Sequence, residues 1–151
     1  TGYEVDSFVR ILEDFLGFSR VDGAFLVGAG SLGSALLQDK GLSAFGLQIE
    51  AAFDTDKTKI GTKVNDIEIF HIDQFRAMAA ERKVVIGIIT VPAEHAQNVA
   101  DLMVAWGIKA IWNFTPARIK VPTHIVVQNT TIYMNLAILF NKLYNDKGEK
   151  N

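Results

Sequence analysis

The most constraining feature of this sequence is a set of three spaced glycines that directly follows an apolar stretch. The letters FLVGAGSLG, residues 25–33, place Gly28, Gly30 and Gly33 in a G-x-G-x-x-G pattern. In such a pattern the first glycine allows a tight turn, the second lets a phosphate group approach the backbone, and the third lets a helix pack close to a strand. The segment therefore predicts a strand, a phosphate-binding turn and a helix in succession.

This turn is expected to hold a dinucleotide or a similar adenosine ligand. Backbone N–H groups at the start of the helix would bind the phosphates, because the first amides of a helix have no partner within it. The expected turn residues are Gly28, Ala29, Gly30, Ser31, Leu32 and Gly33. Glycines also serve ordinary turns, so a ligand-free α/β domain is the alternative on this pattern alone.

An acidic residue stands where such a ligand needs one. Asp54 ends the next predicted strand, 21 residues after Gly33, which is the usual position of the acid that binds the adenosine ribose. Its carboxylate favours NAD over NADP, because a 2′-phosphate about 4 Å away would be repelled by roughly 4 kcal/mol at an effective dielectric constant of about 20. Lys57 and Lys59 would soften this preference, and the alternative for Asp54 is a turn-forming residue at a strand end.

The chain alternates between predicted strands and helices, which indicates parallel strands joined by right-handed crossovers. Apolar or alternating runs predict strands at residues 24–27, 47–54, 67–70, 83–90, 108–114 and 123–128. Helical spacing and end signals predict helices over residues 5–16, 31–40, 73–82, 92–107 and 132–145. Asp73 is the expected cap of the third helix. The predicted fold is α/β, a Rossmann-like doubly wound parallel sheet.

Two further loops are expected to line the ligand site, because ligands of open α/β sheets lie beyond the carboxyl ends of the strands. The loop after residues 83–90 would face the adenosine or diphosphate side, and the loop after residues 108–114 the nicotinamide side. The residues expected there are Thr90, Val91, Pro92, Asn113, Phe114 and Thr115. For each of them a simple loop role is the alternative.

Composition narrows the possible function classes. A formal net charge of −2 and a pI of about 5.9 argue against a nucleic-acid-binding surface within these residues. The absence of cysteine excludes disulfides and thiolate chemistry, and it fits a reducing, cytoplasmic location. We expect no membrane segment, because no run of about 18 apolar residues occurs.

No catalytic or metal-binding set stands out. His71, His95 and His124 lack metal-ligand spacing, and no acid/base pair suggests hydride-transfer chemistry. Trp106 and Trp112 are expected in a core or an interface. The sequence therefore predicts a binding domain with no catalytic residue and no metal site, rather than an enzyme.

The last predicted helix, residues 132–145, is apolar nearly all round. Such a helix is typically buried on most sides. At the end of the sequence a partner subunit is the natural cover, so we expect a homodimer. The alternative is a helix folded back onto its own sheet.

The ordered set of segments resembles the Rex family of bacterial redox-sensing transcriptional repressors, and most closely its Bacteroidetes-type members. The resemblance covers nearly the whole chain. It rests on TGYEVDSFVRILEDFLG, FLVGAGSLGSALL, AAFDTD, VPAEHAQNVAD, GIKAIWNFTP and VPTHIVVQN.

The resemblance implies that these residues are one part of a longer protein. Residues 1–17 would be a linker helix from an N-terminal winged-helix DNA-binding domain, and residues 18–151 an NAD(H)-binding domain with a dimerisation helix exchanged between subunits. NADH binding would close the dimer and release operator DNA, with NAD⁺ competing weakly.

For the site, the resemblance implies that the three glycines receive the pyrophosphate, Asp54 the adenosine ribose, and residues 113–116 the nicotinamide side. Two departures from the family pattern concern the residues that couple the nicotinamide pocket to the partner subunit. Thr131 and Ile132 stand where many members have an acidic residue, and Asp39 stands where some have a tyrosine.

Two other functions stay open at this point. One is a CoA-binding module like that of acyl-CoA synthetase α subunits, against which Asp54 argues. The other is an oxidoreductase without its substrate domain.

Overall fold

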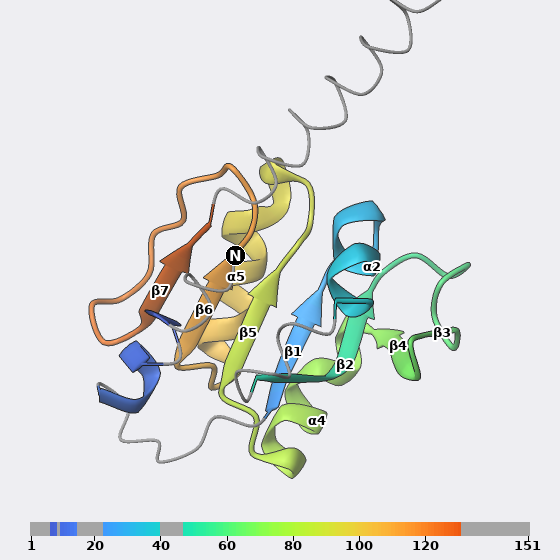
Figure 1. The fold of residues 1–151 in the computed structure, drawn as a ribbon, viewed down its shortest axis with the longest axis horizontal. Coiled ribbons are helices and arrows are strands. Elements are labelled where there is room, and N and C mark those ends of the chain that lie inside the picture. Colours follow the sequence, from blue (N-terminus) through green and yellow to red (C-terminus); the bar gives the residue numbers. More distant parts are fainter. Residues whose placement is uncertain (1–6, 9, 15–22, 40–46, 131–151) are drawn as a thin grey trace, which may run out of the picture.

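The structure is a computed structural model that describes residues 7–8, 10–14, 23–39 and 47–130. A seven-stranded sheet runs in the order β3-β4-β2-β1-β5-β6-β7, with β3 at one edge and β7 at the other (Figure 1). The strands are β1 (Gly23–Val27), β2 (Gln48–Asp54), β3 (Lys63–Val64), β4 (Ile67–His71), β5 (Ile86–Ile89), β6 (Ala110–Asn113) and β7 (Val126–Asn129). Neighbouring strands are parallel except for β3 and β4. Without β3 the order is that of a Rossmann sheet, so the predicted α/β fold is confirmed.

Helices cover both faces of the sheet. They are α2 (Ser31–Leu37), η1 (Ile72–Gln74), α4 (Phe75–Arg82), η2 (Ala93–His95) and α5 (Ala96–Ala105). One core cluster joins α2 and Phe8 to the sheet, and the other joins α4 and α5 to the opposite face. Residues of β1 alternate between the two clusters, which explains why this strand is apolar throughout.

Aromatic rings fill both clusters. Phe25, Phe53 and Phe75 contact one another with ring centroids 4.9 to 5.3 Å apart. On the other face Trp112 lies 5.0 Å from Phe8 and 4.7 Å from Phe114. The prediction that Trp112 belongs to the core is confirmed, since this residue is only 1% exposed.

One element was not predicted: strand β3, which joins β4, the strand expected at residues 67–70, in an antiparallel hairpin. Asn65 and Asp66 form its turn with φ angles of 51° and 64°, and the side chain of Asn65 donates to the Leu37 carbonyl at the end of α2, at 3.2 Å. A strand of two residues is too short to produce an alternating pattern, so the sequence gives no strand signal there.

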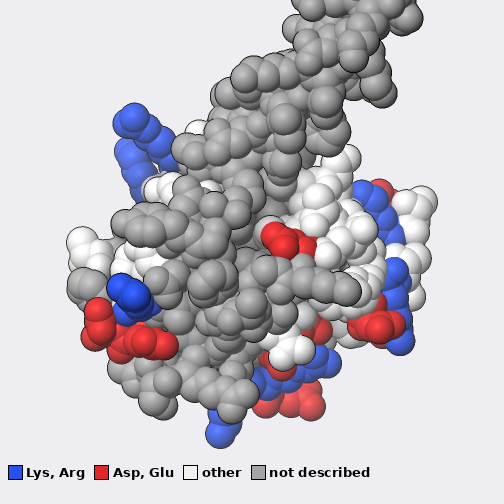
Figure 2. Space-filling model, in the orientation of Figure 1, with Lys and Arg blue, Asp and Glu red and all other residues white. Residues whose placement is uncertain are grey.

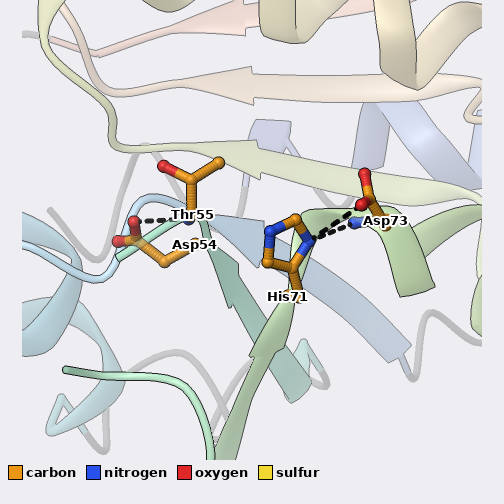
Figure 3. Close-up of polar contacts among 4 residues, drawn as sticks. All are labelled: Asp54, Thr55, His71 and Asp73. Atoms are coloured by element: carbon orange, nitrogen blue, oxygen red, sulfur yellow. Dashed lines mark hydrogen bonds and ion pairs between the residues drawn. The ribbon is translucent and has the colours of Figure 1, made fainter. Parts of the chain in front are cut away.

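The predicted cap at Asp73 is wrong. Nδ1 of His71 accepts the Asp73 N–H at 3.1 Å, and His71 so caps η1. The Asp73 carboxylate lies 3.3 Å from the same nitrogen, a contact that becomes an ion pair only when His71 is protonated (Figure 3). Helix α4 follows η1 directly and has no side-chain cap.

The remaining predicted elements agree with the structure apart from their ends. The strand expected at 123–128 is β7, which begins at Val126, and the helix expected at 92–107 is η2 followed by α5. Within the first expected helix, residues 7–8 and 10–14 are helical. The expected helix over 132–145, its exchange between subunits, and Thr131 and Ile132 lie outside the described residues.

Charges of both signs are interspersed over the face seen in Figure 2, and the described residues form no large patch of one sign there. This distribution agrees with the small net charge of the sequence.

Candidate functional site

The carboxyl ends of the central strands meet at one edge of the sheet. The register pairs Val27 of β1 with Phe53 of β2 and with Ile89 of β5, and it pairs Ile89 with Asn113 of β6. The residues that follow or end these strands therefore lie side by side. This is the edge at which open α/β sheets bind ligands.

Two adjoining cavities open at this edge. The first, here called the Asp54 cavity, has a volume of about 470 Å³ and is lined by Asp54, Asp56, Lys59, His95 and Asn98 together with apolar side chains. The second, here called the Thr115 cavity, has a volume of about 400 Å³. Its lining includes Ser31, Leu32, Glu94, Thr115 and Pro116. Both are lined by Gly30, Thr90, Val91 and Pro92, so they form one continuous cleft.

The glycine turn lies where the two cavities meet, and its three glycines have different surroundings. Gly28 has a φ of +107°, and a Cβ there would lie 2.7 Å from the Thr90 backbone. A Cβ on Gly33 would overlap the carbonyl oxygen of Gly28. A Cβ on Gly30 would meet no atom within 4 Å. Gly28 and Gly33 are thus required by packing, whereas the backbone of Gly30 borders open space inside the cleft.

Thr90 fastens this turn to β5. Its buried hydroxyl donates to the Gly28 carbonyl at 2.7 Å, and the Val27 carbonyl lies 3.1 Å away as a second acceptor. The Gly28 N–H in turn donates to the Phe53 carbonyl at 2.9 Å. Thr90, predicted as a lining residue, lines both cavities and also holds the turn in place.

Asp54 fastens the turn to β2. Its Oδ2 accepts the Ala29 N–H at 2.8 Å, while its Oδ1 accepts the N–H groups of Thr55 at 2.7 Å and Asp56 at 3.0 Å. Figure 3 shows the carboxylate at the end of β2 with its bond to Thr55. The carboxylate is therefore fixed in orientation, half-buried, at the wall of the first cavity.

Two more charged groups surround this end of the cleft. The Lys59 ammonium donates to the Ala29 carbonyl at 2.9 Å. Hydrogen bonds from the hydroxyl and the backbone N–H of Thr58 hold the pKa of Asp56 below its usual range. Asp54, Asp56 and Lys59 thus give the Asp54 cavity two carboxylates and one ammonium group.

The structure places the three residues predicted at the end of β6 and just after it, Asn113, Phe114 and Thr115, in different environments. Thr115 lines the second cavity. Asn113 is fully buried, and Phe114 is 2% exposed with its ring on Trp112. Neither of these two lines the cavities described here.

Several lining residues were missed by sequence reasoning, or considered for another role. His95 was considered above only as a metal ligand, and Glu94 was not named there; both are exposed, yet each lines a cavity. Asn98 was not singled out, and Pro116 was included only through the range 113–116. The signal available was Pro92, because a helix that begins there directs its first turn toward the cleft.

Within the part of the chain that the structure describes, no three His, Asp or Glu side chains gather as a metal site would need. No described helix is both long and apolar enough to cross a bilayer.

Comparisons with known proteins fit this geometry. A model of the CoA binding domain family matches residues 22–117. The redox-sensing transcriptional repressor Rex of Bacteroides fragilis is 58% identical over 142 residues, which cover 94% of this chain and 64% of the relative. Rex of Treponema denticola is 43% identical over 138 residues, covering 91% of this chain and 66% of the relative. The chain thus spans slightly less than two thirds of the length of these curated relatives.

Solved structures of one repressor also resemble this chain in fold and sequence. The crystal structure of RSP, a Rex-family repressor, superposes with a TM-score of 0.73 at 30% identity, covering 96% of this chain and 69% of RSP. RSP has also been solved with β-NAD⁺ and operator DNA, and with β-NADH, at TM-scores of 0.73 and 0.72. The segments that resembled Rex proteins thus lie in a chain with the fold and sequence of that family. The chain carries a domain of the CoA binding domain family and belongs to the Rex family of redox-sensing transcriptional repressors.

Proposed function

We propose that the cleft binds NAD(H) across its two cavities. The adenosine half would occupy the Asp54 cavity, the pyrophosphate the turn of residues 28–33, and the nicotinamide half the Thr115 cavity. The observation that carries this proposal is the open space over Gly30 between two cavities, with the oriented Asp54 carboxylate at one end. An extended ligand with two bulky ends and a slim, charged middle fits this arrangement.

The residues of the Asp54 cavity favour NAD(H) over ligands with a phosphate on the adenosine ribose. Asp54 and Asp56 both line the cavity, and the lowered pKa of Asp56 keeps it ionised at neutral pH. The Lys59 ammonium is engaged by the Ala29 carbonyl. Both NADPH and CoA carry an additional phosphate on this ribose, so both would be repelled there. The name of the matching family model therefore does not make CoA the favoured ligand.

At the other end, Thr115, Pro116 and Leu32 provide a largely uncharged wall for a nicotinamide ring. The residues proposed to contact the ligand are the expected ones, Gly28, Ala29, Gly30, Ser31, Leu32, Gly33, Asp54, Thr90, Val91, Pro92 and Thr115. Phe114 and Asn113 line neither cavity and would support the wall of the Thr115 cavity from behind. The ligand's redox state is the signal, and no chemical step on it is required.

For the whole protein, we propose a homodimeric repressor of the cytoplasm in which this chain is the sensing domain. Residues 1–17 would link it to an N-terminal winged-helix domain that binds operator DNA, and the residues after Thr130 would contact the partner subunit. The names of the relatives and the RSP complexes support this assignment. NADH would shift the dimer toward a state that releases DNA.

Such a shift requires that NADH bind one dimer state more tightly than the other. A coupling of about 1–3 kcal/mol is usual for sensors of this kind. The difference between NADH and NAD⁺ must therefore arise at the nicotinamide end, since their adenosine halves are identical.

The test is a set of titrations on the protein. Cofactor fluorescence gives the NADH affinity at several NAD⁺ concentrations, and calorimetry compares NADH with NADPH and CoA. We expect NADH to bind most tightly, NAD⁺ to compete weakly, and the domain alone not to bind operator DNA. Equal affinity for NADH and NAD⁺ would exclude redox sensing, and tighter binding of CoA would exclude the proposed ligand.

A further inference from the structure

We propose that Asn113 is a positioning residue that ties the wall of the Thr115 cavity to the end of β7. The inference rests on the proposed function, since it concerns the nicotinamide end of the same cleft. It assigns the control of affinity at this end to an amide that touches no ligand.

The hydrogen bonds of Asn113 are complete. Its amide NH₂ donates to the Ala117 carbonyl at 2.8 Å and to Oδ1 of Asn129 at 3.0 Å. Its Oδ1 accepts the Thr115 N–H at 3.0 Å and the Thr115 hydroxyl at 2.7 Å. An asparagine side chain offers two donors and two acceptor positions. All are used inside the protein, and the residue is 0% exposed.

Three of these four bonds shape the turn that faces the cavity. Thr115 and Pro116 line the cavity, and Thr115 and Ala117 are both bonded to the Asn113 amide. The Thr115 hydroxyl also accepts the Ala117 N–H at 3.2 Å. The turn that forms this wall is thus held together by the buried side chain of Asn113. None of the hydrogen bonds that hold Asp54 involves this turn.

The fourth hydrogen bond joins Asn113 to β7, which lies outside the cavity wall. Asn129 ends β7 at the edge of the sheet, and its side chain is bonded to Asn113. A main-chain hydrogen bond joins the same two segments, because the Thr130 N–H donates to the Asn113 carbonyl at 3.1 Å. A displacement of the end of β7 therefore acts on the wall of the Thr115 cavity. The residues after Thr130 are those we propose to contact the partner, so this pair of bonds is a direct route between the partner and the nicotinamide end.

Asn129 gives the cleanest test, because it is exposed and lies outside both cavities. Asn129→Ala removes the acceptor for Asn113, whereas Asn129→Asp retains an oxygen in that position. Gln128→Ala is the matched control on the same strand, since Gln128 donates only to the neighbouring Asn129 carbonyl. The ligands are NADH and ADP-ribose, which lacks the nicotinamide ring.

We expect Asn129→Ala to weaken NADH about threefold to tenfold, the range for one lost hydrogen bond, while ADP-ribose affinity stays within about twofold. Asn129→Asp is expected to restore most of the NADH affinity, and Gln128→Ala to change neither ligand. The ratio of the two affinities is the decisive quantity, because a loss of folded protein lowers both equally and leaves the ratio unchanged.

The outcomes separate the inference from the proposed function. If the wild-type protein binds neither ligand, the proposed function fails. If it binds both, and Asn129→Ala leaves the ratio at the wild-type value, or Asn129→Asp fails to restore it, the positioning role of Asn113 is overturned.

Discussion

The two cavities of the cleft are held in opposite ways. In the Asp54 cavity the group that fixes the wall also faces the space proposed for the ligand, because the Asp54 carboxylate accepts three backbone N–H groups and lines the cavity. In the Thr115 cavity the fixing group, Asn113, is buried behind the wall. Recognition and support are thus combined at one end and separated at the other. The separated arrangement would allow the wall to be adjusted from β7 without changing the residues proposed to touch the ligand.

The largest expected effect is the loss of ligand binding in both cavities at once. Gly33→Ala places a methyl group against the Gly28 carbonyl, so the turn must move. Overpacking of this kind costs about 1–3 kcal/mol of stability. Binding of both NADH and ADP-ribose should fall below detection, and thermal unfolding with calorimetric titration measures both effects.

Gly30→Ala is the matched control for this variant. Its methyl group meets no protein atom within 4 Å, so the free energy of unfolding should stay within about 0.5 kcal/mol of the wild-type value. Its ligand affinity should still fall, because the methyl group occupies the space proposed for the pyrophosphate. Unchanged affinity in Gly30→Ala would remove the pyrophosphate from this turn.

The next effect is confined to the adenosine end. Asp54→Ala removes a charged acceptor and should weaken NADH about 10- to 100-fold, as expected for hydrogen bonds to an ionised group. NADPH should lose less, so the preference for NADH narrows. The ratio of NADH to NADPH affinity, measured by fluorescence titration, checks this. A ratio that does not change would place the ribose elsewhere.

The smallest effect concerns charge at the nicotinamide end. Glu94 is the one charged side chain among the described residues that line the Thr115 cavity. The nicotinamide ring is positive in NAD⁺ and neutral in NADH, so Glu94 would favour the oxidised form if the ring lies in this cavity. Glu94→Gln should raise the ratio of NADH to NAD⁺ affinity by about twofold to fivefold at low salt, since exposed ion pairs contribute roughly 0.2–1 kcal/mol.

Asp101→Asn serves as the control for Glu94→Gln. Asp101 is exposed on α5, in the helix that follows Glu94, but lines neither cavity. An equal shift in both variants would point to the overall charge of the protein rather than to the cavity.

The succession of strands and helices and the glycine turn could be predicted because their signals are local. Gly28, Gly30 and Gly33 lie within six residues of one another, and Asp54 lies at a distance set by one helix and one strand. The role of Asn113 could not be predicted. Its partner Asn129 is 16 residues away, and the contact depends on the register of β6 and β7. Lys59 likewise reaches a carbonyl 30 residues away.

Local signals also gave one wrong result. Asp73 has the residue type of a helix cap, but the helical segment begins earlier: His71 caps η1 by accepting the Asp73 N–H, so Asp73 lies within the first turn. The choice between two competent side chains depends on the end of β4, which spacing alone does not place.

The short hairpin at the edge of the sheet has a consequence for solubility. An edge strand with free N–H and C=O groups invites strand addition from another molecule, and proteins discourage this with short strands and lysine. At this edge β3 has only two residues, and one of them is the exposed Lys63. The sheet therefore offers little template for aggregation on the β3 side.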